Sequence, residues 1–134
     1  MLALGWDSSR LFLHVLAATI WVGGQLVLAV LVPVLRQAGP EVPRAAARAF
    51  NRVAWPAFAV LVATGIWNIT AERALDQGAD YRHTLWLKLG VVAASGITAF
   101  AHVRASTSRG RALFGALTAL SALAALLLGI LLAG

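Results

Sequence analysis

Two side chains in otherwise apolar segments of this sequence, an imidazole and an amine, could bind a metal ion or a prosthetic group. His14 and Lys88 each lie a few residues inside the start of such a segment. A neutral imidazole donates a nitrogen lone pair to a metal ion, whereas a lysine amine can do so only after it loses its proton. These two residues are therefore the first candidates for a binding site.

Further nitrogen and oxygen donors lie near the ends of the same segments. Asn68 and Glu72 end the second apolar segment, and His83 precedes the third. The sequence contains no cysteine, and its single methionine is the first residue, so thiolate and thioether ligands are absent. A metal ion bound by this protein would therefore need nitrogen or oxygen ligands, and we predict them to come from His14, His83, Glu72 and Asn68.

Sequence motifs of several common enzyme classes are absent. The chain has no GxGxxG, no Walker loop, no HExxH and no GxSxG motif. Its three histidines are scattered, which does not favour a hydrolytic zinc site. The sequence leaves open whether the protein is an enzyme.

Four long apolar segments must position these candidate residues. Hydrophobic residues make up 60% of the 134 residues and charged residues only 12%, too few to cover the surface of a soluble domain. About 20 helical residues cross a bilayer, and apolar segments of that length lie at about 11–35, 53–71, 84–103 and 112–133. They lack the period-two alternation of barrel strands. We predict an all-α integral membrane protein with one transmembrane domain over residues 1–134.

Short connections between the segments predict an up-down-up-down four-helix bundle. Seven of the 11 basic residues lie at the ends joined by the first and third connections: Arg36, Arg44, Arg48, Arg52, Arg104, Arg109 and Arg111. The opposite ends carry charges that sum to zero: Arg10, Arg73, Arg82 and Lys88 against Asp7, Glu72, Asp76 and Asp80. Arginine-rich connections face the cytoplasm. This predicts a multi-pass protein of the inner (cytoplasmic) membrane with both termini outside. The net charge of +6 is then explained by contact with the lipid bilayer rather than by nucleic-acid binding.

Helical spacing gives several of the segments a distinctive face. In the first, His14, Trp21 and Gln25 share one face, and we expect Gln25 to hydrogen-bond a neighbouring helix. The third carries polar residues at heptad spacing: Lys88, Ser95 and His102. The fourth has a line of small residues that permits close helix packing: Gly115, Thr118, Ala122, Ala125 and Gly129. Snorkelling of Lys88 and an interfacial position of His14 are the alternatives to ligand binding.

Three stretches, residues 14–36, 48–69 and 81–100, resemble the CopD copper-resistance family of inner-membrane proteins. The matching features are a first-helix histidine followed by W-x-G-G, a T-G in the second helix and Y-x-x-x-L-x-x-K at the start of the third. The resemblance implies handling or transport of copper across the cytoplasmic membrane, with His14 and Lys88 as the recurrent polar residues. It also implies a periplasmic copper-binding partner. Longer members carry eight helices, so we predict a homodimer here.

The chain is also similar, more distantly, to the membrane protoporphyrinogen oxidase-like bundles that bind haem. The residues that correspond to theirs are His14, Trp86 and Lys88. This second resemblance implies a haem-b redox protein in which His14 is an axial ligand. A third hypothesis is an accessory subunit of a larger membrane complex with no site of its own.

Overall fold

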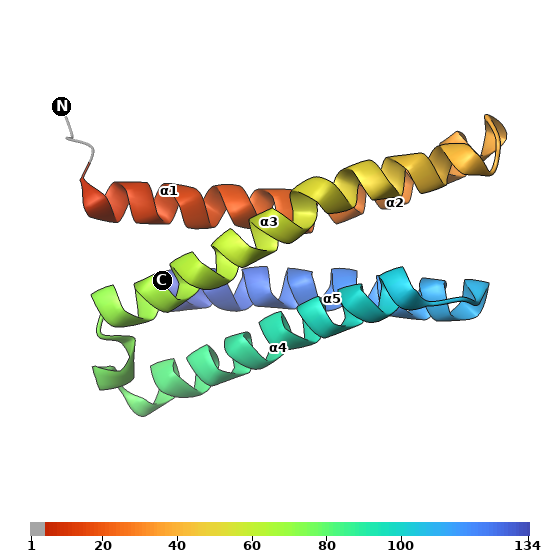
Figure 1. The fold of residues 1–134 in the computed structure, drawn as a ribbon. Helices are drawn as coiled ribbons and strands as arrows, with labels where there is room; N and C mark the ends of the chain where they lie inside the picture. Colours follow the sequence, from red (N-terminus) through yellow and green to blue (C-terminus); the bar gives the residue numbers. More distant parts are fainter. Residues whose placement is uncertain (1–4) are drawn as a thin grey trace. The chain divides into compact units, whose positions relative to one another are not determined.

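The chain is helical over nearly all of the residues that the structure describes. The computed structural model describes residues 5–134, which form long helices and no strand (Figure 1). Four continuous helical spans are long and apolar enough to cross a membrane: Trp6–Gln37, Glu41–Ala71, Ala79–Arg104 and Ser108–Ala133. The predicted all-α class with four membrane-spanning helices is confirmed, and these four spans fit a four-helix bundle.

The helices begin and end with residues suited to those positions. The first span consists of α1 (Trp6–Ala18), a π-helical segment (Thr19–Gly23) and α2 (Gly24–Gln37). Gly39 then takes a φ of 128°, a conformation that favours glycine, and Pro40 precedes α3 (Glu41–Ala71). A short 3-10 helix (Ala74–Asp76) leads to α4 (Ala79–Arg104). The Thr107 side chain caps α5 (Ser108–Ala133) by accepting a hydrogen bond from the Gly110 amide, at 3.0 Å.

All four spans begin before the segments that were predicted from apolar length. The prediction for the second span began at about residue 53, whereas α3 begins at Glu41 and includes the Arg44–Phe50 stretch in one continuous helix of 31 residues. The difference arises because a helix can continue past the hydrocarbon with polar and charged turns. Apolar length therefore gave the spans but not their ends.

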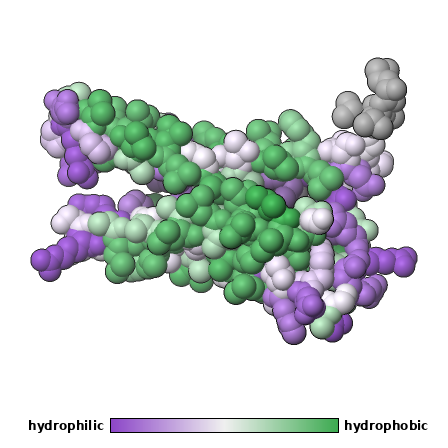
Figure 2. Space-filling model, turned by 180° about the vertical axis from the view of Figure 1, so that it is seen from behind, coloured by the Kyte–Doolittle hydropathy of each residue, from purple (hydrophilic) through white to green (hydrophobic). Residues whose placement is uncertain are grey.

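The chain divides into two compact units, each of which is an antiparallel helical hairpin. Unit 1 (Met1–Glu72) contains α1, the π-helical segment, α2 and α3, and unit 2 (Arg73–Gly134) contains α4 and α5. Figure 2 shows hydrophobic side chains over the middle lengths of the helices and hydrophilic side chains at their ends. This distribution is the one expected of helices that cross a bilayer.

Aromatic rings fill the middle of unit 1. The buried Trp21 ring lies 5.6 Å from the Trp55 ring and 4.4 Å from the Phe58 ring, measured between centroids. Gly24 lies beside the Phe50 ring, and a Cβ at Gly24 would overlap that ring. The W-x-G-G motif therefore contributes to the contact between the first span and α3 in two ways: Trp21 supplies an aromatic ring, and Gly24 leaves the space that the Phe50 ring fills.

A π-helical turn interrupts the first span at Thr19–Gly23 and ends two residues before Gln25. Such turns change which face the following residues present. The Gln25 side chain donates from Nε2 to the carbonyl oxygen of Trp21, at 2.8 Å. This bond lies within its own helix, whereas the sequence favoured a bond to a neighbouring helix.

Candidate functional site

His14 lies at the contact between α1 and α3, where Thr64 holds its ring. The distance from His14 Nδ1 to Thr64 Oγ1 is 2.8 Å. The Thr64 hydroxyl donates its single proton to backbone carbonyl oxygen, with the Val60 oxygen at 2.7 Å. Thr64 Oγ1 therefore accepts a hydrogen bond from His14, so Nδ1 carries the hydrogen and Nε2 carries the lone pair of the neutral ring.

The glycine after Thr64 lies against the same ring. A Cβ at Gly65 would be 3.6 Å from His14 Cε1, an ordinary van der Waals distance. Thr64 and Gly65 are the T-G pair of the second helix, and His14 is the first-helix histidine. Two of the features that carry the sequence resemblance thus contact each other in unit 1.

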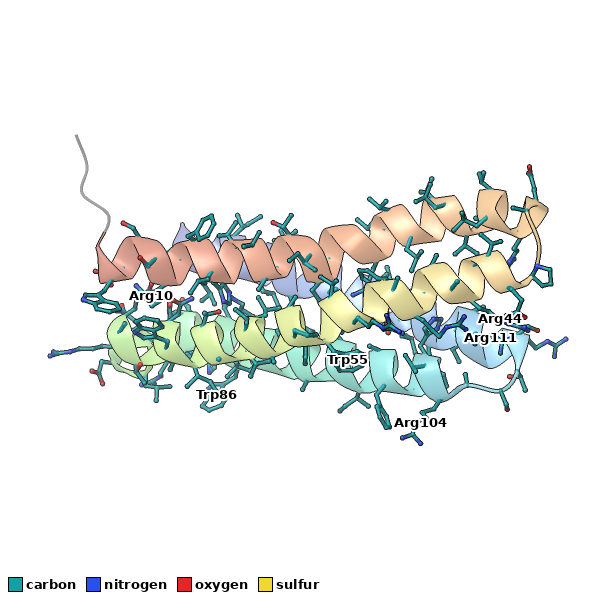
Figure 3. The ribbon with its side chains drawn as sticks, turned by 45° about the horizontal axis from the view of Figure 1, so that its top comes forward. Arg10, Arg44, Trp55, Trp86, Arg104 and Arg111 are labelled. Atoms are coloured by element: carbon teal, nitrogen blue, oxygen red, sulfur yellow. The ribbon has the colours of Figure 1, made fainter. Side chains whose placement is uncertain are left out.

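A buried arginine lies one helical turn before His14. Arg10 is only 4% exposed and lies between the start of α1 and the end of α3 (Figure 3). Its Nη1 donates to Asn68 Oδ1 and, at 3.1 Å, to Glu72 Oε1, and its Nη2 donates to Asp7 Oδ1 at 3.3 Å. We call Asp7, Arg10, Asn68 and Glu72 the arginine cluster. One guanidinium and two carboxylates give it a formal charge of −1.

The arginine cluster changes what can be said of two predicted metal ligands. Asn68 and Glu72 were expected to offer oxygen to a metal together with His14, but in the structure both accept hydrogen bonds from Arg10. A guanidinium beside these oxygens repels a metal cation. Within residues 5–134, no group of three or more His, Asp or Glu side chains could hold a metal ion. Metal binding by Asn68 and Glu72 stays a prediction, and it would compete with these bonds.

Two residues of this region were not singled out from the sequence as site residues: Arg10 and Thr64. Arg10 had been assigned only to the balanced charges at the outer ends. A signal was present, because Arg10, His14, Ala17 and Trp21 recur at helical spacing on one face. Asn68 and Glu72 are four residues apart near the end of an antiparallel helix, so a buried arginine with these partners could have been inferred.

The other candidate residues, Lys88, Trp86 and His83, belong to α4 in unit 2. A Cβ at Gly129 would be 3.2 Å from Lys88 Nζ, so the lysine tip lies against α5 where glycine leaves room for it. His83 is exposed, and Trp86 is 60% exposed, as expected of an aromatic residue near a membrane interface (Figure 3). Because His14 belongs to unit 1, a pocket shared by His14 and Lys88 stays a prediction.

The polar face of α4 packs on the small-residue face of α5. Ser95 Oγ donates to the Thr118 carbonyl oxygen at 3.3 Å, and Thr118 Oγ1 donates to Thr98 Oγ1 at 3.0 Å. His102 Nδ1 donates to the Arg111 carbonyl oxygen at 2.7 Å. The small residues of α5 thus serve the hairpin itself, and His102 joins its two helices.

No protein-family model, curated protein or solved structure matches the chain.

Proposed function

We propose that this chain is a membrane protein that binds a metal centre through His14, and that the centre is haem b. The observation that carries the proposal is the bond from His14 Nδ1 to Thr64. A histidine that ligates a metal commonly donates its other ring N–H to an oxygen, which fixes the tautomer and the orientation of the ring. Thr64 would do this for His14, and the iron would then be bound by Nε2.

The donor set of unit 1 fits haem better than copper. Haem iron takes its four equatorial nitrogens from the porphyrin, so one imidazole from the protein is enough to hold it. A copper ion without sulfur ligands needs several nitrogen or oxygen donors, and Arg10 engages the nearest oxygens. His14 would bind the iron, and the second resemblance also implies a role for Lys88. Bound haem would supply one-electron transfer.

Copper handling is the second candidate, and it is supported by the resemblance to the CopD family. In that case His14 would be the imidazole ligand, and Asn68 and Glu72 would be the nearest oxygen donors of unit 1. The protein would lie in the cytoplasmic membrane, like the members of that family. It would form a homodimer, because two copies would supply the eight helices of longer family members. A periplasmic copper-binding protein would be its partner.

The test is an absorption spectrum and metal analysis of the full chain purified in mild detergent. We expect a Soret band in the wild type and its loss in His14→Ala, with helical content unchanged. His83→Ala is the matched control because this histidine is exposed, and it should retain the band. Lys88→Met tests the second residue, since it keeps the length of the side chain and removes the charge.

Each other outcome selects a different hypothesis. Copper without haem in the wild type, lost in His14→Ala, would favour the second candidate. If the wild type held neither group after reconstitution with each, the proposal would fail, and an accessory subunit without a site would be the remaining hypothesis.

A further inference from the structure

α3 is longer than a membrane span requires, and the excess is at its N-terminal end. It has 31 residues, which at 1.5 Å each extend about 46 Å, whereas the hydrocarbon core is about 30 Å thick. Residues 53–71 carry no charge and extend about 28 Å, close to that thickness. The remaining part, Glu41–Arg52, therefore extends beyond the hydrocarbon.

Three exposed arginines lie along this extension, about one helical turn apart: Arg44, Arg48 and Arg52. Residues four apart lie on the same side of a helix, so the three form one stripe. Arg52 lies at the edge of the uncharged stretch, Arg48 about 6 Å further out and Arg44 about 12 Å further out. The headgroup layer is about 5–8 Å thick on each side of the hydrocarbon. Arg48 and Arg52 therefore lie at the depth of lipid phosphates, and Arg44 lies beyond it.

The partners of these arginines differ with depth. Arg44 Nη1 lies 2.6 Å from Glu41 Oε1 and forms an ion pair. Over residues 5–134, neither Arg48 nor Arg52 forms an ion pair or a side-chain hydrogen bond. In unit 2, by contrast, Arg104 lies over the Phe100 ring and Arg111 donates to backbone carbonyl oxygens. The two arginines at headgroup depth are thus the ones on this stripe that lack a protein partner.

We propose that Arg48 and Arg52 bind the phosphate groups of anionic phospholipids at this end of α3. A guanidinium presents a planar fork of N–H donors that matches phosphate oxygens, and a basic segment beside a membrane span attracts an anionic lipid surface. Arg36 at the end of α2 adds a positive charge to the same end of unit 1. The inference is independent of the metal centre and of which side of the membrane this end faces.

The experiment uses the full chain in nanodiscs that contain equal amounts of phosphatidylglycerol and phosphatidylcholine. Native mass spectrometry of the released protein measures how much of each lipid is retained. We expect the wild type to retain phosphatidylglycerol preferentially, and we expect the preference to fall about five-fold in Arg48→Gln or Arg52→Gln and about 25-fold in the double variant.

Arg44→Gln is the matched control, because this arginine lies on the same stripe and already has Glu41 as a partner. It should change the preference by less than about two-fold, since an exposed pair contributes little. All substitutions are at exposed positions, and circular dichroism verifies the helical content. Equal retention of the two lipids by the wild type would overturn the proposal. So would a double variant that behaves like the wild type, or an Arg44→Gln variant that loses as much as the double variant.

Discussion

Thr64 sets the orientation of the His14 ring through one hydroxyl group. The hydroxyl accepts from Nδ1 and donates to a backbone carbonyl oxygen of its own helix. A ring held in this way presents the same nitrogen at all times, which lowers the entropy cost of metal binding. The contribution of Thr64 should therefore be measurable apart from that of His14.

Thr64→Val should weaken binding of the metal centre about 10–100-fold while leaving the hairpin folded, because it removes the acceptor for Nδ1 and keeps a similar shape. Titration of the apoprotein with haem would measure the change in Kd. Thr70→Val is the control, since the exposed Thr70 hydroxyl bonds only carbonyl oxygens of α3. An unchanged Kd in Thr64→Val would mean that the bond does not support a ligand.

Arg10 joins the ends of α1 and α3 from a buried position. Arg10→Met should destabilise the protein by about 1–3 kcal/mol, because Asn68 Oδ1 and Glu72 Oε1 lose their charged donor. Thermal unfolding in detergent would measure this as a lower Tm. Arg44→Met removes an exposed pair with Glu41 and should cost about 0–1 kcal/mol. Equal effects of the two substitutions would argue against a structural role for the arginine cluster.

The sequence was enough to name His14 and Lys88 as candidate binding residues, but it did not predict which side chains surround them. A histidine or lysine inside an apolar segment is rare enough to be noticed without a structure. Arg10 has nearby opposite charges in the sequence, so its burial is not apparent from composition. The contact between Thr64 and His14 is not apparent from the sequence either, because the hydroxyl of a threonine in a membrane helix can always donate a hydrogen bond to a backbone carbonyl oxygen of its own helix. Its second bond depends on the register between α1 and α3.

Two adjacent glycines of the W-x-G-G motif make different contributions to the first helical span. A Cβ at Gly24 would overlap the Phe50 ring, whereas a Cβ at Gly23 would meet nothing within 4 Å. Gly24→Ala should therefore cost about 1–3 kcal/mol through displacement of the ring. Gly23→Ala should leave stability unchanged or raise it by up to about 1 kcal/mol, through helix propensity. Unfolding in detergent would compare them, and the opposite order would contradict the packing described for unit 1.

Elements were predicted well in number and type, and less well in their details. Apolar length fixes the number of spans because the bilayer has a fixed thickness. It does not fix where a helix ends, as the Arg44–Phe50 stretch of α3 shows. Nor does it reveal the π-helical turn at Thr19–Gly23, because one extra residue in a turn leaves composition and hydropathy unchanged. The hydrogen bond from Gln25 to the Trp21 carbonyl oxygen was missed as well.

For the whole molecule, the distribution of arginines predicts that both termini lie outside the cell. A reporter that is active only in the cytoplasm should give no signal when it is fused after Gly134, because the arginine-rich connections hold the opposite ends of the helices inside. A reporter active only outside should give a signal at the same position. The reverse pattern would place the arginine-rich connections outside and both termini in the cytoplasm.

Self-association stays a prediction, and the structure removes one of its arguments. The line of small residues on α5, which permits close helix packing, would suit contact with a second copy, but α4 already packs on it through Ser95 and His102. What remains is the eight-helix architecture of the resembling family. Native mass spectrometry in mild detergents should show a dimer, and monomers alone across all of them would count against it.

The packing of α4 against α5 in unit 2 also has a consequence for how the chain is inserted into the membrane during synthesis. Ser95 is only 1% exposed because α5 covers it, and Lys88 lies against Gly129 of the same helix. During synthesis α4 leaves the ribosome first, with its polar line uncovered, and only residues 105–107 separate it from α5. The later helix also contains the more apolar 18-residue stretch, with a mean hydropathy of 2.4 against 1.5. We therefore expect α4 to wait at the insertion machinery until α5 arrives, so that the pair enters the lipid as one preassembled hairpin.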